Sequence, residues 1–329
     1  MNNEATHRKE IPRPTLALSV ILPVYNEEEN IVELHQEITA VLDTMEGQTE
    51  VIYVDDGSSD GTLERLQDLY AGDDRVVVVE FRRNFGQTAA MAAGFELARG
   101  KVVIAMDADR QNDPADIPKL LAKVDEGYDL VSGWRYERKD GFLLRLLPSR
   151  IANKLISWAT DVRLHDYGCS LKAFRYDVVK QISLYGEMHR VIPALASAVG
   201  VRIAEVKVNH RPRVAGESKY GISRTFRVLL DLITVKFLLR FSSKPLQFFG
   251  SFGLVSGFFG FLICLWLTME KLLDHTPMAD RPLLLLGLLL LFIGLQFITV
   301  GLLAELMTRT YHEAQDKPIY TVRNLYRRK

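Results

Sequence analysis

The sequence has few cysteines, no net charge and no apolar segment near its N-terminus. Its two cysteines, Cys169 and Cys264, lie in an expected loop and in an apolar run, which argues against a disulfide framework and fits a reducing compartment. The formal net charge is +0 at pH 7, which argues against nucleic acid as a partner. Residues 1–15 are expected to form a polar N-terminal tail, without the apolar stretch that a signal peptide requires.

Charged residues are also missing from two long stretches, Leu246 to Met269 and Pro282 to Ala304. Each exceeds the roughly 20 residues that cross a bilayer core, whereas two buried helices of a soluble core are the weaker alternative. The short connector 270–281 predicts a hairpin, 246–306. The basic residues flanking this hairpin predict that both chain ends are cytoplasmic, with a basic tail at 307–329. Because the spans contain no ionisable residue, a lipid-transport subunit is a poor alternative.

The N-terminal half alternates strand-like and helix-like patterns, which predicts a parallel, doubly wound α/β sheet. We expect helices at 27–45, 62–70 and 87–98. The expected strands are Leu16 to Pro23, Glu50 to Val54, Val76 to Phe81, Val102 to Met106 and Leu130 to Gly133. Ligands of such sheets bind beyond the carboxyl ends of the strands, where this sequence places Asp55-Asp56 and Asp107-Ala108-Asp109.

Two further segments combine apolar and basic residues at helical spacing. The segment 223–241, inside an expected juxtamembrane region 221–245, runs directly into the first apolar stretch, so we expect it in the lipid interface. For 142–160, packing on the sheet and lying in the interface are both open. Gly250, Gly253 and Gly257 include a spacing of small residues that lets helices pack, and a homo-oligomer stays open.

Two aspartates one residue apart at a strand end favour a magnesium site. Mg²⁺ is commonly held by one or two carboxylates together with substrate phosphates, and Gln111 offers a further oxygen close to Asp107 and Asp109. An isolated Asp-x-Asp is a weak signal. Here its position after a buried strand gives it weight, because a diphosphate in a carboxylate-lined crevice needs a cation.

Several motifs together resemble glycosyltransferase family 2, whose members are inverting nucleotide-sugar transferases. The general motifs are Val20-Ile21-Leu22-Pro23-Val24-Tyr25-Asn26-Glu27, Val54-Asp55-Asp56-Gly57-Ser58-Ser59-Asp60 and Asp107-Ala108-Asp109. Those that resemble the polyprenyl-phosphate branch are Arg83-Asn84-Phe85-Gly86-Gln87, Asp166-Tyr167-Gly168-Cys169-Ser170-Leu171-Lys172 and Gly216-Glu217-Ser218-Lys219-Tyr220. That branch includes dolichol-phosphate mannose synthase, undecaprenyl-phosphate glucosyltransferases and the aminoarabinose transferase of lipid A modification.

The resemblance implies a Rossmann-like nucleotide-sugar transferase domain of the GT-A type over residues 16–220. It implies that Pro23, Tyr25, Glu27 and Asp56 contact the nucleotide, with a helix cap as the alternative for Glu27. Asp107, Asp109 and Gln111 would surround the diphosphate and a Mg²⁺ or Mn²⁺ ion. Arg135, Ser218 and Lys219 would bind the acceptor phosphate. Asp166 resembles the proposed general base, and we keep Asp166 and Asp109 as catalytic candidates.

The implied reaction is inverting transfer of a hexose from a nucleotide diphosphate sugar to polyprenyl (undecaprenyl) phosphate, at the cytoplasmic face of a bacterial inner membrane. We expect UDP-glucose as donor, with a UDP-4-amino-arabinose derivative, UDP-N-acetylglucosamine or GDP-mannose as alternatives. The acceptor phosphate has a second pKa of about 6, so at neutral pH it is mostly a dianion and needs no strong base. Asp166 is therefore expected to orient groups more than to take a proton. A processive polysaccharide synthase is disfavoured because its Gln-x-x-Arg-Trp motif is missing.

One position departs from the family pattern. Arg110 stands where a leucine is usual, in Asp107-Ala108-Asp109-Arg110-Gln111. Contact with the diphosphate and exposure to solvent are both open for this side chain. His189 resembles a residue near the acceptor, and we leave it out of catalysis.

Overall fold

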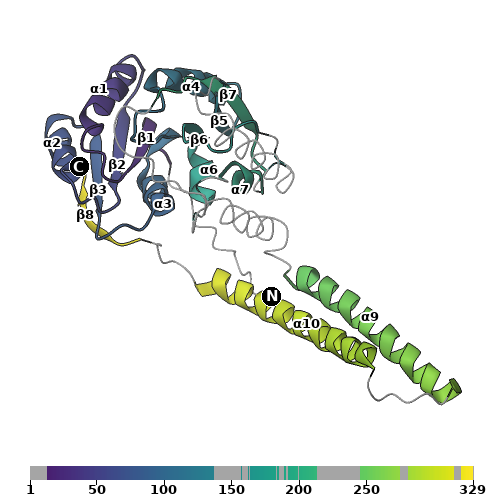
Figure 1. The fold of residues 1–329 in the computed structure, drawn as a ribbon. Helices are drawn as coiled ribbons and strands as arrows, with labels where there is room; N and C mark the ends of the chain where they lie inside the picture. Colours follow the sequence, from purple (N-terminus) through teal and green to yellow (C-terminus); the bar gives the residue numbers. More distant parts are fainter. Residues whose placement is uncertain are drawn as a thin grey trace, which may run out of the picture. The chain divides into compact units, whose positions relative to one another are not determined.

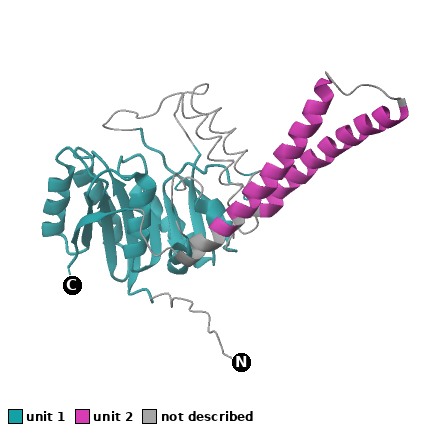
Figure 2. Cartoon of the chain, turned by 90° about the horizontal axis from the view of Figure 1, so that it is seen from below, with its two compact units in different colours: residues 1–235, 318–329 teal, residues 236–317 magenta. Residues whose placement is uncertain are grey.

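The computed structural model divides the chain into two compact units. Unit 1 comprises residues 1–235 and 318–329, and unit 2 comprises residues 236–317 (Figure 2). The structure describes residues 13–136, 157, 162, 164–182, 184, 189, 192–198, 200–212, 245–274, 281–314 and 320–328. Ser218, Lys219 and the segment 223–241 lie outside the described residues, as does 142–160 apart from Ser157.

Unit 1 is built on a sheet of eight strands in the order β7-β5-β6-β4-β1-β2-β3-β8 (Figure 1). The strands are β1 (Leu16–Val24), β2 (Thr49–Asp55), β3 (Val76–Phe81), β4 (Gly100–Ala105), β5 (Leu130–Arg135), β6 (Lys172–Arg175), β7 (Ile203–Val208) and β8 (Val322–Tyr326). The helices of unit 1 are α1 (Ile31–Leu42), α2 (Thr62–Gly72), α3 (Gln87–Leu97), η1 (Pro114–Asp116), α4 (Ile117–Asp125), α6 (Tyr176–Gln181) and α7 (Ile192–Ala198).

The sheet is mixed as a whole, but the five strands predicted from the sequence, β1 to β5, all run in the same direction, as predicted. Strand β1 pairs in parallel with β2 and β4, β2 with β3, and β5 with β7. Strand β6 runs antiparallel between β4 and β5, and β8 runs antiparallel along β3. The alternating pattern predicts βαβ units, whose crossovers make parallel pairs. It carries no information on strands β6 and β8, whose partners lie far away in the sequence.

Apolar side chains on both faces of the central strands explain why the sheet is covered on both sides. Strand β3 is buried along its whole length, and such continuous apolar runs are typical of strands covered by helices on both faces. Helices α1, α2 and α4 contribute Leu34, Leu66 and Leu120 to the core on one face. Helices α3 and α6 cover the other face, so the domain has three layers.

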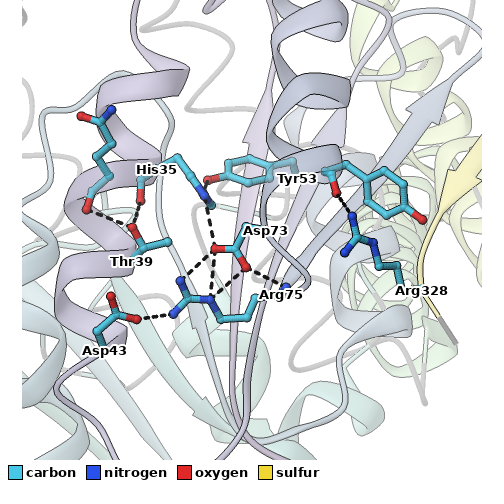
Figure 3. A network of polar contacts seen from close by, with 9 residues as sticks. His35, Thr39, Asp43, Tyr53, Asp73, Arg75 and Arg328 are labelled. Carbon is cyan, nitrogen blue, oxygen red and sulfur yellow. Dashed lines mark hydrogen bonds and ion pairs between the residues drawn. The ribbon is translucent and has the colours of Figure 1, made fainter.

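A polar network ties α1, β2 and the turn between α2 and β3 together (Figure 3). The Nδ1 atom of His35 lies 2.9 Å from the hydroxyl of Tyr53, and its Nε2 lies 3.5 Å from Asp73. Arg75 donates to Asp73 and also to Asp43 at 2.6 Å. Burial lowers the pKa of His35, although the charge of Asp73 opposes this. The network gives these buried polar groups partners within the fold.

Unit 2 consists of two long helices, α9 (Pro245–Asp274) and α10 (Pro282–Ala314). Each begins with proline, which suits the first turn because the missing N–H has no helical acceptor there. Among the described residues, the segments Leu246–Leu273 and Pro282–Ala304 are long and apolar enough to cross a membrane. Most of their large apolar side chains are exposed, which is not the pattern of soluble core helices.

Glycines bring α9 and α10 close together. A Cβ atom on Gly253 would lie 2.6 Å from the carbonyl oxygen of Gly294, and one on Gly260 would lie 2.7 Å from that of Gly287. Small residues let helix backbones approach in this way where apolar lipid provides little drive for association. Gly253, one of the closely spaced glycines of α9, therefore packs against α10 of the same chain.

Gly100 allows β4 to lie directly against β1. A Cβ atom there would meet the backbone nitrogen of Ser19 at 2.3 Å and the backbone carbon of Leu18 at 2.5 Å. Backbone atoms cannot move aside as a flexible side chain can. We therefore expect Gly100→Ala to lower the free energy of unfolding of unit 1 by about 1–3 kcal/mol, measured by thermal unfolding of the full chain.

Gly72→Ala is the matched control, because nothing lies within 4 Å of a Cβ atom at the end of α2. We expect this variant to be neutral or stabilised by up to about 1 kcal/mol, since alanine has the higher helix propensity. Equal stability of the two variants would contradict the proposed close approach of β4 and β1.

Candidate active site

The ends of β1, β2 and β4 bring three loops to one edge of the sheet. Val24 pairs with Asp55, and Ile21 pairs with Ala105, so the loops after these strands begin side by side. The amide of Asn26 donates to Ser58 Oγ at 3.0 Å, which links the first two loops directly. The predicted carboxylates therefore gather where ligands bind in sheets of this type.

The first of these loops also starts helix α1. The amide of Glu27 donates to Thr62 Oγ1 at 2.9 Å, and its carboxylate accepts from Asn30 Nδ2 at 2.7 Å. Pro23 lies on β1 opposite Val54, directly before Val24 and Tyr25. The structure thus groups Pro23, Tyr25 and Glu27 at the predicted edge, and shows that Glu27 also organises the start of α1.

Asp56 is bound by the loop that follows β3. Its two carboxylate oxygens accept hydrogen bonds from the amides of Phe85 at 2.7 Å and Gly86 at 2.9 Å. Burial raises the pKa of Asp56, although these two amides oppose the shift. Gly57 has φ of 71°, and a Cβ atom there would lie 2.6 Å from the backbone of Arg83. A glycine is needed here for both reasons, and the two loops are held in close contact.

Asp107 and Asp109 follow β4 at the same edge. Gln87 Nε2, in the first turn of α3, donates to Asp107 Oδ1 at 2.7 Å. Burial and the charge of Asp109 raise the pKa of Asp107 to about 6. The amide of Gln111 donates to Asp109 Oδ1 at 3.2 Å, which folds the loop back on itself. Gln87 ends the motif that begins at Arg83, and its contact with Asp107 gives it a place in the site that the motif alone does not reveal.

This pair of carboxylates fits a divalent cation. Hard oxygen ligands suit Mg²⁺ and Mn²⁺, and a bound cation would relieve the repulsion that raises the pKa of Asp107. Within the described part of the chain, no group of three or more His, Cys, Asp or Glu side chains is placed to hold a metal. Two carboxylates completed by phosphate oxygens are the usual magnesium arrangement at such sites.

Arg110 points toward helix α1. It has φ of 59°, a left-handed conformation that is uncommon outside glycine, and its guanidinium pairs with Glu33 and with Glu37, the latter at 2.9 Å. Arg211 also pairs with Glu37, at 2.5 Å. The charge at this unusual position is therefore matched by α1, which answers the question that the sequence left open.

Asp166 and Arg135 form a two-pronged ion pair. Arg135 Nε lies 2.7 Å from Asp166 Oδ2, and Nη2 lies 2.9 Å from Oδ1. The amide of Gly168 adds a third hydrogen bond to Oδ1 at 3.1 Å, and only 3% of Asp166 is exposed. Burial lowers the pKa of Arg135, but the hydrogen bonds and charge of Asp166 raise it above its ordinary value. Asp166 is thus placed to orient Arg135.

Lys172 and Ser170 are further site residues without a predicted role. Lys172 is 2% exposed on β6, where its ammonium donates to the carbonyl oxygens of Cys169 and, at 3.5 Å, Tyr167. Burial lowers its pKa. Ser170 hydrogen-bonds to Asp107 and accepts from Asn112 at 2.7 Å. The ammonium of Lys172 therefore helps to fix the loop that presents Ser170 to Asp107.

The chain is similar to known glycosyltransferases along most of its length. The family profile described as Glycosyl transferase family 2 matches residues 19–183. The chain belongs to this family. It is 46% identical over 320 residues to a dodecaprenyl-phosphate galacturonate synthase of Rhizobium johnstonii, covering 96% of this chain and 94% of that one. It is 38% identical over 312 residues to an undecaprenyl-phosphate 4-deoxy-4-formamido-L-arabinose transferase of Edwardsiella ictaluri, covering 94% of each.

Solved structures confirm the fold. A glucosyl-3-phosphoglycerate synthase of Mycobacterium tuberculosis, solved with Mn²⁺ and uridine-diphosphate-glucose, aligns with a TM-score of 0.51 at 20% identity, over 68% of this chain and 79% of that one. A mannosyl-3-phosphoglycerate synthase of Rubrobacter xylanophilus aligns with a TM-score of 0.53 at 18% identity, over 68% and 74%. These structures confirm the predicted GT-A fold, and the relatives at 46% and 38% identity confirm the polyprenyl-phosphate glycosyltransferase class. With its two apolar helices, this is a membrane-associated enzyme.

The geometry of Asp166 leads to a prediction about pH dependence. If Asp166 orients Arg135, Asp166→Asn should lower turnover and keep the wild-type acid limb, because that limb belongs to the acceptor phosphate with a pKa of about 6. The measurement is turnover against pH at saturating donor for both proteins. A wild-type limb that disappears in Asp166→Asn, with a loss on the order of 10²–10⁴-fold, would instead identify Asp166 as the general base.

Proposed function

We propose that this enzyme transfers a uronic acid, galacturonic acid, from its uridine diphosphate carrier to a polyprenyl phosphate such as undecaprenyl phosphate. The observation that carries the donor is the 46% identity, along nearly the whole chain, with a dodecaprenyl-phosphate galacturonate synthase. The second candidate is the formamido-arabinose sugar, which is supported by relatives at 35–38% identity. The expected donor UDP-glucose finds no support among these relatives.

In the proposed site, Asp107 and Asp109, with Gln111 nearby, would hold a Mg²⁺ or Mn²⁺ ion against the donor diphosphate. When bound, this ion would supply positive charge that offsets the charge of the leaving nucleoside diphosphate. Asp56, with Pro23, Tyr25 and Glu27, would hold the nucleotide at the ends of β1 and β2. The loop from Phe85 to Gln87 links the metal side and the nucleotide side of this site, because the amide of Phe85 binds Asp56 and the side chain of Gln87 binds Asp107.

The acceptor side of the proposed reaction uses the chemistry of the lipid phosphate itself. Its dianion attacks the anomeric carbon of the sugar, the bond to the diphosphate breaks, and the configuration inverts. Lys172 and Arg135, the latter held by Asp166, are both close enough to Asp107 for their charges to lower its pKa. Ser218 and Lys219 keep their proposed role in binding the acceptor phosphate. The enzyme is proposed to span a bacterial inner membrane with its catalytic domain in the cytoplasm.

The donor is tested with the purified full-length enzyme in detergent. We expect undecaprenyl phosphate and UDP-galacturonic acid to give a lipid product whose mass increases by one galacturonosyl residue, resolved by mass spectrometry. The UDP-linked formamido-arabinose, UDP-glucose, UDP-N-acetylglucosamine and GDP-mannose are run in parallel. A higher kcat/KM for any of these donors than for UDP-galacturonic acid would overturn the proposed donor and leave the reaction class intact.

The metal role is tested with Asp109→Asn. We expect turnover to fall on the order of 10²-fold or more, because charge compensation by a metal contributes several kcal/mol to such transfers. In the wild type, chelator should weaken the binding of UDP measured by calorimetry, and added Mg²⁺ or Mn²⁺ should restore the affinity. Asp68→Asn, an exposed carboxylate on α2, is the matched control and should leave both quantities unchanged. Full turnover in excess chelator would contradict the metal role.

A further inference from the structure

The strand β8 connects the C-terminal part of the chain to the candidate donor site. The chain leaves unit 1 after residue 235, forms unit 2, and returns to unit 1 at residue 318. Val322 pairs with Phe81, and Tyr326 pairs with Val78, so β8 begins at the carboxyl end of β3 and runs antiparallel along it. The amide of Arg82 also donates to the carbonyl oxygen of Thr321 at 3.2 Å. The contact therefore extends past β3 into the loop that begins there.

Tyr320 packs on the last residue of β3. Its ring stacks on Phe81 with 5.0 Å between the ring centroids and 18° between the planes. Phe81 in turn meets the ring of Phe85 edge-on at 5.6 Å. Phe81 is 1% exposed, so it is fixed between these neighbours. Aromatic pairs in such arrangements stabilise one another beyond the area that they bury.

The same tyrosine also reaches helix α3. Its hydroxyl donates to the carboxylate of Glu96, near the end of that helix. Tyr320 thus contacts the last residue of β3, directly before the loop 82–86, and the C-terminal end of α3, the helix that follows this loop. A single side chain at this place can restrict how far the strand and the helix move apart, and thereby restrict the loop between them.

The loop 82–86, together with Gln87 that follows it, binds Asp56 and Asp107, the two carboxylates assigned to the donor. The amides of Phe85 and Gly86 bind Asp56, and the side chain of the next residue, Gln87, binds Asp107. The contacts from Tyr320 through Phe81 and Phe85 therefore lead to the proposed nucleotide carboxylate and to the proposed metal carboxylate. None of the motifs used in the sequence analysis includes Tyr320.

We propose that Tyr320, two residues before β8, is a positioning residue for the donor nucleotide. It acts through Phe81 and Phe85, which keep the amides of residues 85 and 86 aimed at Asp56. The proposal rests on the proposed function, in which Asp56 and Asp107 face the nucleotide diphosphate. It assigns to the segment after the membrane hairpin a part in donor binding.

The test uses the full-length enzyme and three variants, two at Tyr320, which lies two residues before β8, and one at Tyr326 on β8. Tyr320→Ala should raise KM for the nucleotide sugar, and Kd for UDP by calorimetry, by about three- to tenfold, the range expected for losing an aromatic pair. KM for the lipid acceptor should stay unchanged. Tyr320→Phe keeps the ring stack and loses only the bond to Glu96, so it should restore most of the donor affinity.

Tyr326→Ala is the matched control. Tyr326 is the last residue of β8 and contacts Tyr70 at 6.0 Å between ring centroids, away from the loop 82–86. It should lower Tm as Tyr320→Ala does and leave KM for the donor unchanged. An equal rise in donor KM for both alanine variants, or a rise in neither, would overturn the proposal and reduce β8 to a stabilising strand.

Asp56→Asn separates this proposal from the proposed donor site. Weaker UDP binding in Asp56→Asn with unchanged binding in Tyr320→Ala would overturn the role of Tyr320 and leave the donor site in place. Unchanged UDP binding in Asp56→Asn would overturn the donor site itself. Loss of donor affinity in Asp56→Asn and Tyr320→Ala, with recovery in Tyr320→Phe, supports both.

Discussion

The parallel pairing of β1 with both β2 and β4 is the constraint on which the site depends. It places the carboxyl ends of three strands at one edge, so that loops distant in the sequence meet there. The close contact of β4 with β1 at Gly100 and the continuous apolar faces of the central strands keep that edge in register. The pairing of these strands is therefore sufficient to bring the acidic residues to the same edge of the sheet.

The arginines around this edge are paired with carboxylates of the protein. Arg110 is matched by Glu33 and Glu37, and Arg135 is matched by Asp166, so these cations and anions largely satisfy each other within the protein. Asp107 lies close to Asp109, and burial, followed by the charge of Asp109, raises the pKa of Asp107. A site with this balance favours a ligand that arrives with its own cation, as a metal-bound diphosphate does.

The sequence predicts the parts of this structure that depend on neighbouring residues. The strand before Asp107, the βα alternation and the apolar spans are all local patterns, and they predicted the fold class, the spans and the acidic edge. The bidentate contact of Arg135 with Asp166 and the contact of Arg110 with α1 join residues 31 and 77 positions apart, so no local pattern reveals them. The strand β6 has four residues and β8 lies in a basic segment, and both are defined by their partners in the sheet. Lys172 was missed for a similar reason, because its role comes from burial beside two loop carbonyls.

The position of β8 in the sequence has a consequence for biosynthesis. Both apolar helices are translated before β8, so β3 is the edge of a still incomplete sheet while these two helices are being made. An uncovered edge strand exposes a row of backbone donors and acceptors that can pair with other chains. Arrival of β8 removes that hazard and brings Tyr320 to its place at the same moment. In the proposed membrane topology, insertion of the two helices therefore precedes closure of the sheet, and a nascent chain halted between α10 and β8 would carry an open edge.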